Sequence, residues 1–149
     1  MVTKDELVIW FVLFGLPVTA FAQAMAAPQI WTPISQNAKT ITGRLSFSSR
    51  ELTFQNGTSL SLTFSSQMLF RSEAKAKRVM ADLYKITPPA DPALQNGNRL
   101  CKGKPVAYLI LWKSEDAGRE AERGLAPFSG PQINAGSPDD CGHYAYEAR

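Results

Sequence analysis

The sequence predicts an all-β domain: a small antiparallel β-barrel or sandwich of six to eight strands, held by one disulfide. Three observations support this prediction. Apolar and polar residues alternate with a period of two in several short segments, as in strands with one face in a core and one in water. Gly, Asn and Pro residues separate these segments. The only two cysteines, Cys101 and Cys141, follow a segment typical of an export signal.

Residues 1–24 have the features of a secretory signal peptide. The apolar run from Leu7 to Val18 is too short to span a bilayer as a helix, which needs about 20 residues. Ala20-Phe21-Ala22 and Ala22-Gln23-Ala24 follow it, and both fit the small-x-small pattern of a signal-peptidase site. An uncleaved N-terminal anchor is the alternative. We therefore predict a periplasmic or secreted protein that meets the membrane only through this segment.

The rest of the chain is expected to form an extended N-terminal arm at residues 25–39 and a single antiparallel β domain at residues 40–149. Pro28 and Pro33 leave no helical period in the arm. Trp31 is expected either to pack as a plug on one end of the domain or to stack on a ligand.

The clearest alternation lies in residues 40–64. Every second position is apolar or Gly in three segments: Ile41, Gly43, Leu45 and Phe47; Leu52 and Phe54; Leu60, Leu62 and Phe64. Asn56-Gly57 favours a hairpin turn, because both residues tolerate positive φ, and Ser48-Ser49 is expected to form the preceding turn. These segments predict a three-stranded meander.

Residues 65–78 leave a short surface helix and a long hairpin connection both open. The segment ends in a basic run, which is either a solvated face or a contact for an acidic partner or an anionic envelope polymer: Arg71, Lys75, Lys77 and Arg78. Residues 79–86 predict a strand with Met80, Tyr84 and Ile86 on one face, although a helix also fits. The Pro-rich residues 87–98 predict a loop.

The segment from Val106 to Lys113 is apolar at almost every position. One alternating set contains Val106, Tyr108, Ile110 and Trp112, and the other contains Ala107, Leu109 and Leu111. A strand of this kind is usually central and covered on both faces. Its second face could instead be an exposed binding surface.

The C-terminal part is expected to hold two more strands. Residues 114–124 are polar and allow a short helix capped by Ser114, Leu125 to Ser129 is a short strand candidate, and residues 130–140 form a loop. Gly142 to Glu147 predicts the last strand, with Tyr144 and Tyr146 on one face. Two buried free thiols are the alternative to the disulfide between Cys101 and Cys141.

The residue inventory argues against most catalytic chemistries. With one histidine, His143, and two cysteines that are expected to pair, we predict no metal site and no cofactor. No Gly-x-Ser-x-Gly motif is present. The spacing of Glu51, Asp82 and Asp91 selects no catalytic carboxylate pair. A hydrolase using His143 stays as an alternative.

Four aromatic residues are the best candidates for a binding surface, although burial in the core is the favoured interpretation: Tyr108, Trp112, Tyr144 and Tyr146. The formal net charge of +3 in 149 residues is small and spread out, so we expect no nucleic-acid partner. We expect a monomer that meets another envelope protein or polymer.

Three segments resemble a group of short exported bacterial proteins without an assigned activity: Tyr84–Pro89 (YKITPP), Leu94–Cys101 (LQNGNRLC) and Cys141–Tyr146 (CGHYAY). The resemblance implies export and a paired cysteine. In size, compartment and fold class the chain is also similar to small periplasmic barrels that inhibit lysozymes or proteases, which is an analogy of architecture alone.

The leading functional hypothesis is therefore an exported non-catalytic binding protein, with inhibition of an envelope enzyme as its specific form. A small barrel that binds a hydrophobic ligand is the second hypothesis, motivated by the doubly apolar segment at Val106–Trp112.

Overall fold

The protein is an eight-stranded antiparallel β-barrel, described by a computed structural model over residues 27–71 and 77–149. The predicted signal peptide and Lys75 of the basic run lie outside these residues. The strands are β1 (Gln29–Pro33), β2 (Leu45–Phe47), β3 (Glu51–Thr53), β4 (Ser59–Phe70), β5 (Val79–Ala90), β6 (Val106–Lys113), β7 (Glu122–Phe128) and β8 (Tyr144–Ala148).

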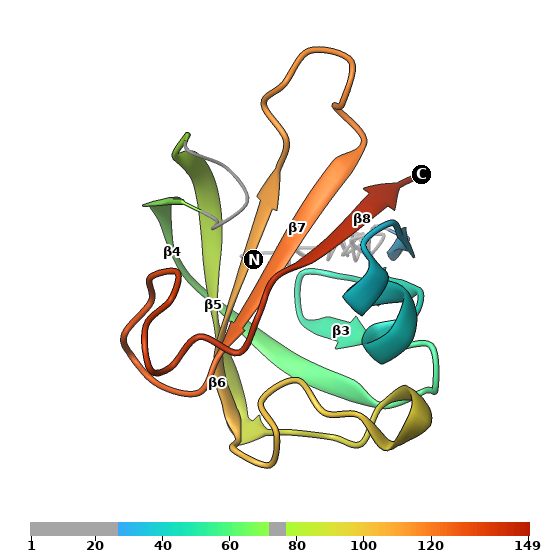
Figure 1. The fold of residues 1–149 in the computed structure, drawn as a ribbon, viewed down its shortest axis with the longest axis vertical. Coiled ribbons are helices and arrows are strands. Elements are labelled where there is room, and N and C mark those ends of the chain that lie inside the picture. Colours follow the sequence, from blue (N-terminus) through green and yellow to red (C-terminus); the bar gives the residue numbers. More distant parts are fainter. Residues whose placement is uncertain (1–26, 72–76) are drawn as a thin grey trace, which may run out of the picture.

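Each strand pairs with its neighbours in sequence, and β1 pairs with β8 to close the barrel (Figure 1). The closing register places Trp31 opposite Ala148 and Pro33 opposite Tyr146. The predicted all-β barrel with one disulfide is thus confirmed. The domain starts earlier than expected, because part of the predicted N-terminal arm is the strand β1.

The alternation predicted that Ile41 lies in a strand, and this prediction is wrong. Ile41 lies in a single helical turn, η1 (Ala38–Thr42), which begins where the Asn37 side chain accepts a hydrogen bond from Ala38 N. The turn ends at Gly43, whose φ of 64° favours glycine and whose N–H bonds to Ala38 O at 2.8 Å.

The β3–β4 hairpin turns at Asn56-Gly57, as predicted. Gly57 has a φ of 89°, and its N–H donates to Phe54 O at 2.9 Å, while Phe54 N donates to Thr58 O at 2.8 Å. The Asn56 side chain also donates to Ala93 O at 2.8 Å, which ties this turn to the loop after β5.

Of the two alternatives for residues 65–78, the structure has the long hairpin and not the helix. β4 runs on to Phe70, and β5 pairs with it from Val79 onward. β5 also extends through Pro88 and Pro89 to Ala90, into the segment predicted to be a loop. Met80, Tyr84 and Ile86 share one face of β5, as expected: Tyr84 and Ile86 pack in the barrel interior, and Met80 is exposed near the start of the strand.

The barrel interior is filled by inward-facing residues from all eight strands. The largest of these side chains that are almost fully buried include Tyr146, Leu45, Leu52, Leu60, Leu109 and Leu125. Tyr146 also forms a short contact of 2.6 Å with Thr42 Oγ1, so its hydroxyl has a buried partner. The interior is therefore apolar, and the buried Tyr146 hydroxyl is paired with the buried Thr42 side chain.

A second core covers the outer face of β4 to β7. Its buried members are Phe70, Ala81, Ile110, Ala126 and Phe128, with Met68, Leu83, Tyr108, Trp112, Ile133 and Ala135 packed against them. The last two come from the loop between β7 and β8, which folds back over the sheet. β6 is therefore covered on both faces, as its composition predicts.

Val106 does not lie on the face of β6 to which the sequence pattern assigned it. Val106 packs in the interior with Leu109, and not on the outer face with Tyr108 and Ile110. The pairing of β5 with β6 is irregular between Lys85 and Ala90, so the simple alternation breaks at the start of β6.

The disulfide between Cys101 and Cys141 joins the β5–β6 loop to the β7–β8 loop at one end of the barrel. Beside it, the Asp91 carboxylate accepts hydrogen bonds from Leu100 N (3.1 Å), Cys101 N (3.3 Å) and Gly103 N (2.8 Å). We call this end, with the loops at residues 91–105, the closed end.

Replacing both Cys101 and Cys141 with Ala should lower the free energy of unfolding by about 4 kcal/mol, the loop-entropy value for a separation of 40 residues. The two cores remain, so the melting temperature should fall while the far-ultraviolet circular dichroism spectrum keeps its β signature. Complete loss of that signature would show that the barrel depends on the bond.

The stability of the barrel should fall as the pH rises from 10 to 12. Burial, with a smaller effect of Asp91, raises the pKa of Tyr144 to about 12, whereas an unfolded tyrosine ionises near pH 10. Between these values the folded state keeps a proton that the unfolded state has lost, so each such tyrosine costs about 1.4 kcal/mol per pH unit. Urea denaturation at several alkaline pH values should show a shallower decline for Tyr144→Phe; an identical decline would contradict the assignment.

Candidate functional site

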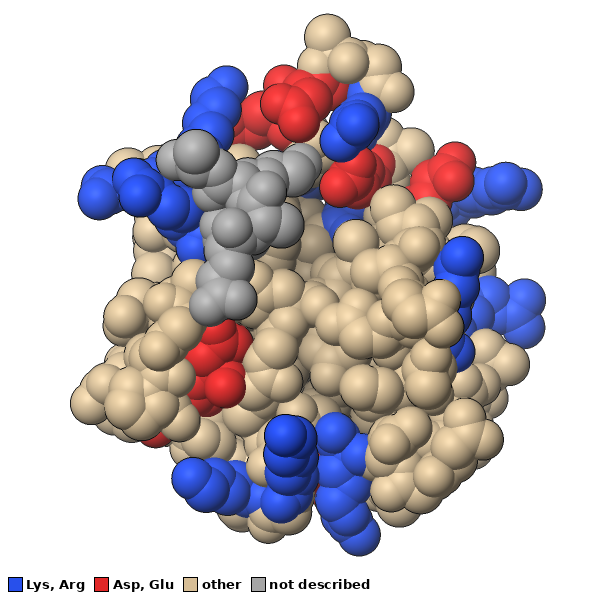
Figure 2. All heavy atoms as spheres, in the orientation of Figure 1, with Lys and Arg blue, Asp and Glu red and all other residues tan. Residues whose placement is uncertain are grey.

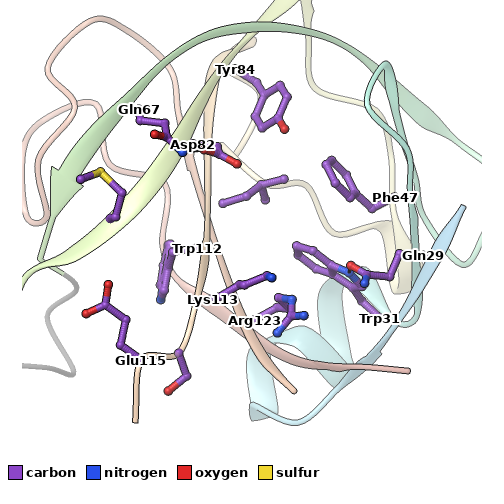
Figure 3. Close-up of a pocket in the computed structure, with 13 residues that line it drawn as sticks. Gln29, Trp31, Phe47, Gln67, Asp82, Tyr84, Trp112, Lys113, Glu115 and Arg123 are labelled. Atoms are coloured by element: carbon purple, nitrogen blue, oxygen red, sulfur yellow. Dashed lines mark hydrogen bonds between the residues drawn. The ribbon is translucent and has the colours of Figure 1, made fainter. Parts of the chain in front are cut away.

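The other end of the barrel opens into a cavity of about 510 Å³, which we call the cup (Figure 3). Its lining comes from six strands and from the residues just after β6: Gln29, Trp31, Phe47, Gln67, Met80, Asp82, Tyr84, Leu111, Trp112, Lys113, Ser114, Glu115 and Arg123. The cup lies opposite the disulfide and the closed end.

Aromatic rings line the apolar part of the cup. The ring centroid of Phe47 is 5.4 Å from that of Trp31 and 6.0 Å from that of Tyr84. Trp31 Nε1 donates to Gln29 Oε1 at 2.8 Å, which holds the indole in place. Trp31 is only 2% exposed, so it packs as the predicted plug and still contributes to the cavity wall.

Two basic residues lie side by side on the β6–β7 wall of the cup (Figure 3). Lys113 and Arg123 are directly opposite each other in the antiparallel register. Arg123 is buried, and its Nη1 donates to the carbonyl oxygens of Glu120 (2.6 Å) and Glu122 (3.1 Å). Burial lowers the pKa of the Arg123 guanidinium, so its charge is poorly solvated.

The acidic residues of the cup lie apart from this basic pair. Asp82 projects from β5 and accepts a hydrogen bond from Gln67 Nε2 at 3.1 Å, and Glu115 lies at the rim after β6 (Figure 3). Burial, with a smaller effect of Asp82, raises the pKa of Tyr84. The cup therefore has a basic wall, a polar wall and an aromatic floor.

The four aromatic residues proposed for binding do not form one surface. Tyr144 and Tyr146 are in the barrel interior, whereas Tyr108 and Trp112 are half-buried on the outer face. Of the four, only Trp112 lines the cup. Tyr108 lies opposite Phe128 and Tyr144 lies opposite Leu125, and these two β7 residues, three positions apart, face opposite sides of the wall.

His143 is the last residue of the β7–β8 loop, and its ring packs against those of Phe70 (centroids 5.6 Å apart) and Trp112 (6.3 Å). Its Nε2 is 3.2 Å from Asp140 Oδ2, but the two atoms are not aligned as a hydrogen bond, so we assign only an electrostatic contact. Asp140 itself accepts from Gly136 N and Gly142 N, which indicates a structural role in the loop.

The other residues singled out for chemistry are dispersed. Asp91 organises the closed end, Asp82 lines the cup and Glu51 begins β3. Over residues 27–71 and 77–149, no cluster of three or more His, Cys, Asp or Glu side chains is arranged to hold a metal ion. Within the same ranges, no helix is long and apolar enough to cross a membrane.

The basic pair was missed because its two members come from different predicted elements. Arg123 lies in the polar segment 114–124, for which a short helix was considered, and β7 in fact begins at Glu122. Continuing the alternation of Leu109 and Leu111 by one step would have placed Lys113 on the inward face. No comparable pattern in the sequence indicates Arg123.

Comparisons of the chain with protein-family models, with curated proteins and with solved structures gave no match. The chemistry of the cup is therefore inferred from its own residues.

Gly124→Ala should destabilise the wall of the cup. Trp112 lies across Gly124, its cross-strand partner, so that a Cβ at this position would be 2.0 Å from Trp112 Cε2. Displacing a packed ring should lower the free energy of unfolding by about 1–3 kcal/mol, measured by urea denaturation. In a Trp112→Leu background the same change should cost much less. An equal cost in both backgrounds would show that the contact is not responsible.

Proposed function

We propose that this protein is an exported, non-catalytic binding protein whose cup takes an amphipathic small molecule with an apolar body and an anionic group. The observation that carries the proposal is the Lys113–Arg123 pair on the inner wall, beside an aromatic floor. The expectation that the protein inhibits an envelope enzyme stays a prediction.

The basic pair favours an anion. Like charges directly opposite each other on adjacent strands repel and destabilise the sheet. Lys113 is exposed, so the repulsion acts between its solvated ammonium and the buried side chain of Arg123. A carboxylate, phosphate or sulfonate between the two side chains would remove this cost and gain charge-assisted hydrogen bonds. The basic wall is therefore better suited to a bound anion than to the empty barrel.

The floor favours an apolar body on the same ligand. Rings of Trp31, Phe47 and Tyr84 can pack against a ring or a short chain. The volume of about 510 Å³ lies within the range of small-molecule sites, roughly 300–1,000 Å³. This supports the second sequence-based hypothesis, a barrel with a hydrophobic ligand, and adds a charged group to that ligand.

Export is supported by the disulfide. Bonds such as Cys101–Cys141 persist in oxidising compartments outside the cytosol. A receptor of this kind would meet its ligand in the periplasm or outside the cell.

Two fluorescent probes can test the cup. The first, 1-anilinonaphthalene-8-sulfonate, combines aromatic rings with a sulfonate, and the second, N-phenyl-1-naphthylamine, lacks the charge. Lys113→Gln should weaken binding of the sulfonate about tenfold, since loss of about 1.4 kcal/mol of charge-assisted contact corresponds to that factor. It should leave the binding of the neutral probe nearly unchanged.

Lys104→Gln, at an exposed position near the closed end, is the matched control and should change neither affinity. Equal affinity of the wild-type protein and Lys113→Gln for the sulfonate would refute the anion site. Failure of both probes to bind the folded wild-type protein would refute the cup as a small-molecule site.

A further inference from the structure

β4 has a free edge in an otherwise closed barrel. On one side it pairs with β5 from Leu62 to Phe70. On the other side its pairing with β3 covers only Ser59 to Ser61, followed by one bond from Leu62 N to Arg50 O at 2.8 Å. From Thr63 to Phe70, no strand among the described residues covers this second edge. The β4–β5 hairpin extends well beyond the short β3 (Figure 1).

The sequence of this edge gives little protection against pairing. Natural edge strands usually carry Lys, Pro or inward-pointing charges, which prevent another strand from adding. The segment from Thr63 to Phe70 (TFSSQMLF) contains no charged residue and no proline. A register shift between Phe64 and Ser66 is its one irregular feature. The backbone groups of the edge are therefore available to a further strand.

The inward face of the same hairpin exposes large apolar side chains. Phe64, Leu69 and Met80 are 54%, 57% and 49% exposed. Phe64 is paired with Tyr84, and Leu69 with Met80, so all three share the face that continues the wall of the cup. Side chains of an added strand would lie against these residues at every second position.

The end of the hairpin is basic. Arg71, Lys77 and Arg78 are exposed just beyond the free edge, and Lys and Arg side chains gather at this end of the hairpin in Figure 2. The protein has a formal net charge of +3. An acidic end on the added strand would therefore be favoured.

We propose that the free edge of β4 docks an extended segment of a partner protein, which adds to the barrel as a further strand. The segment would carry apolar side chains at alternate positions, packed over Phe64 and Leu69, and Asp or Glu at the end nearest Arg71. Main-chain hydrogen bonds supply affinity in this mode of recognition, and the alternate side chains supply specificity.

A second copy of the chain is a less suitable occupant. If two β4 edges paired antiparallel over residues 63–70, Arg71 of each copy would lie opposite Leu62 of the other. Leu62 N donates a hydrogen bond to Arg50 O, so Arg50 lies beside Leu62. At each end of the pairing, Arg71 of one copy would therefore approach Arg50 of the other. An acidic segment avoids this repulsion.

The docking edge is separate from the small-molecule site of the cup. Phe64 and Leu69 do not line the cup, and Lys113 and Arg123 do not lie on the hairpin. Leu69→Lys should therefore leave the affinity for the neutral probe, N-phenyl-1-naphthylamine, unchanged. Each proposal can fail without the other.

The test is a selection of random peptides of about ten residues, displayed on phage, against the immobilised full chain. Enriched peptides should have β-branched or aromatic residues at alternate positions and acidic residues at one end. A synthetic copy should bind Leu69→Lys at least about tenfold more weakly than wild type, because the variant places a charge on the docking face. N-methylation at every second residue on one edge of the peptide should abolish binding.

Ile34→Lys is the matched control, because Ile34 is also an exposed apolar residue (42%) but lies just after β1. It should bind the synthetic peptide as wild type does, and both variants should keep the wild-type melting temperature. The proposal is overturned by the absence of enriched peptides, or by equal binding to Leu69→Lys. It is also overturned if sedimentation shows a dimer that Leu69→Lys dissociates, which would make a second copy the occupant.

Discussion

The unequal length of the strands determines the shape of this barrel. β2 and β3 have three residues each, whereas β4 and β5 have twelve. A closed barrel needs every strand to be paired on both edges, so closure is possible only along the part that the short strands reach. Beyond it, β4 to β7 continue without a complete ring. The cup, the exposed face of the β4–β5 hairpin and the free edge of β4 all follow from this mismatch.

The two ends of the barrel consequently differ in their physical chemistry. At the closed end, the disulfide, the Asp91 carboxylate and the Asn56 amide bind the loops together through covalent and hydrogen bonds. At the open end, two cations face each other and large apolar side chains meet solvent. Features that cost stability tend to be concentrated where a protein binds its ligands. The contrast is the physical basis for assigning recognition to the open end and stability to the closed end.

The β3–β4 hairpin and the central strand could be predicted because their signals are local, and the disulfide because the chain has only two cysteines. Asn56-Gly57 marks a turn in adjacent residues, and the apolar sequence of β6 indicates a strand covered on both faces. The candidate site could not be predicted in the same way. Lys113 and Arg123 become neighbours only through the register of β6 with β7. The binding residues chosen by composition, Tyr108, Trp112, Tyr144 and Tyr146, are instead divided between the interior and the outer face.

The sequence by itself therefore determined the strand content, the pairing of its two cysteines and the apolar identity of the central strand, since these depend on period, composition and near neighbours. Only the tertiary structure decided where the barrel closes, which charges meet and which edge is left free. These properties depend on cross-strand register and on the relative lengths of β3 and β4, and one residue of register reverses the face of every side chain in a strand.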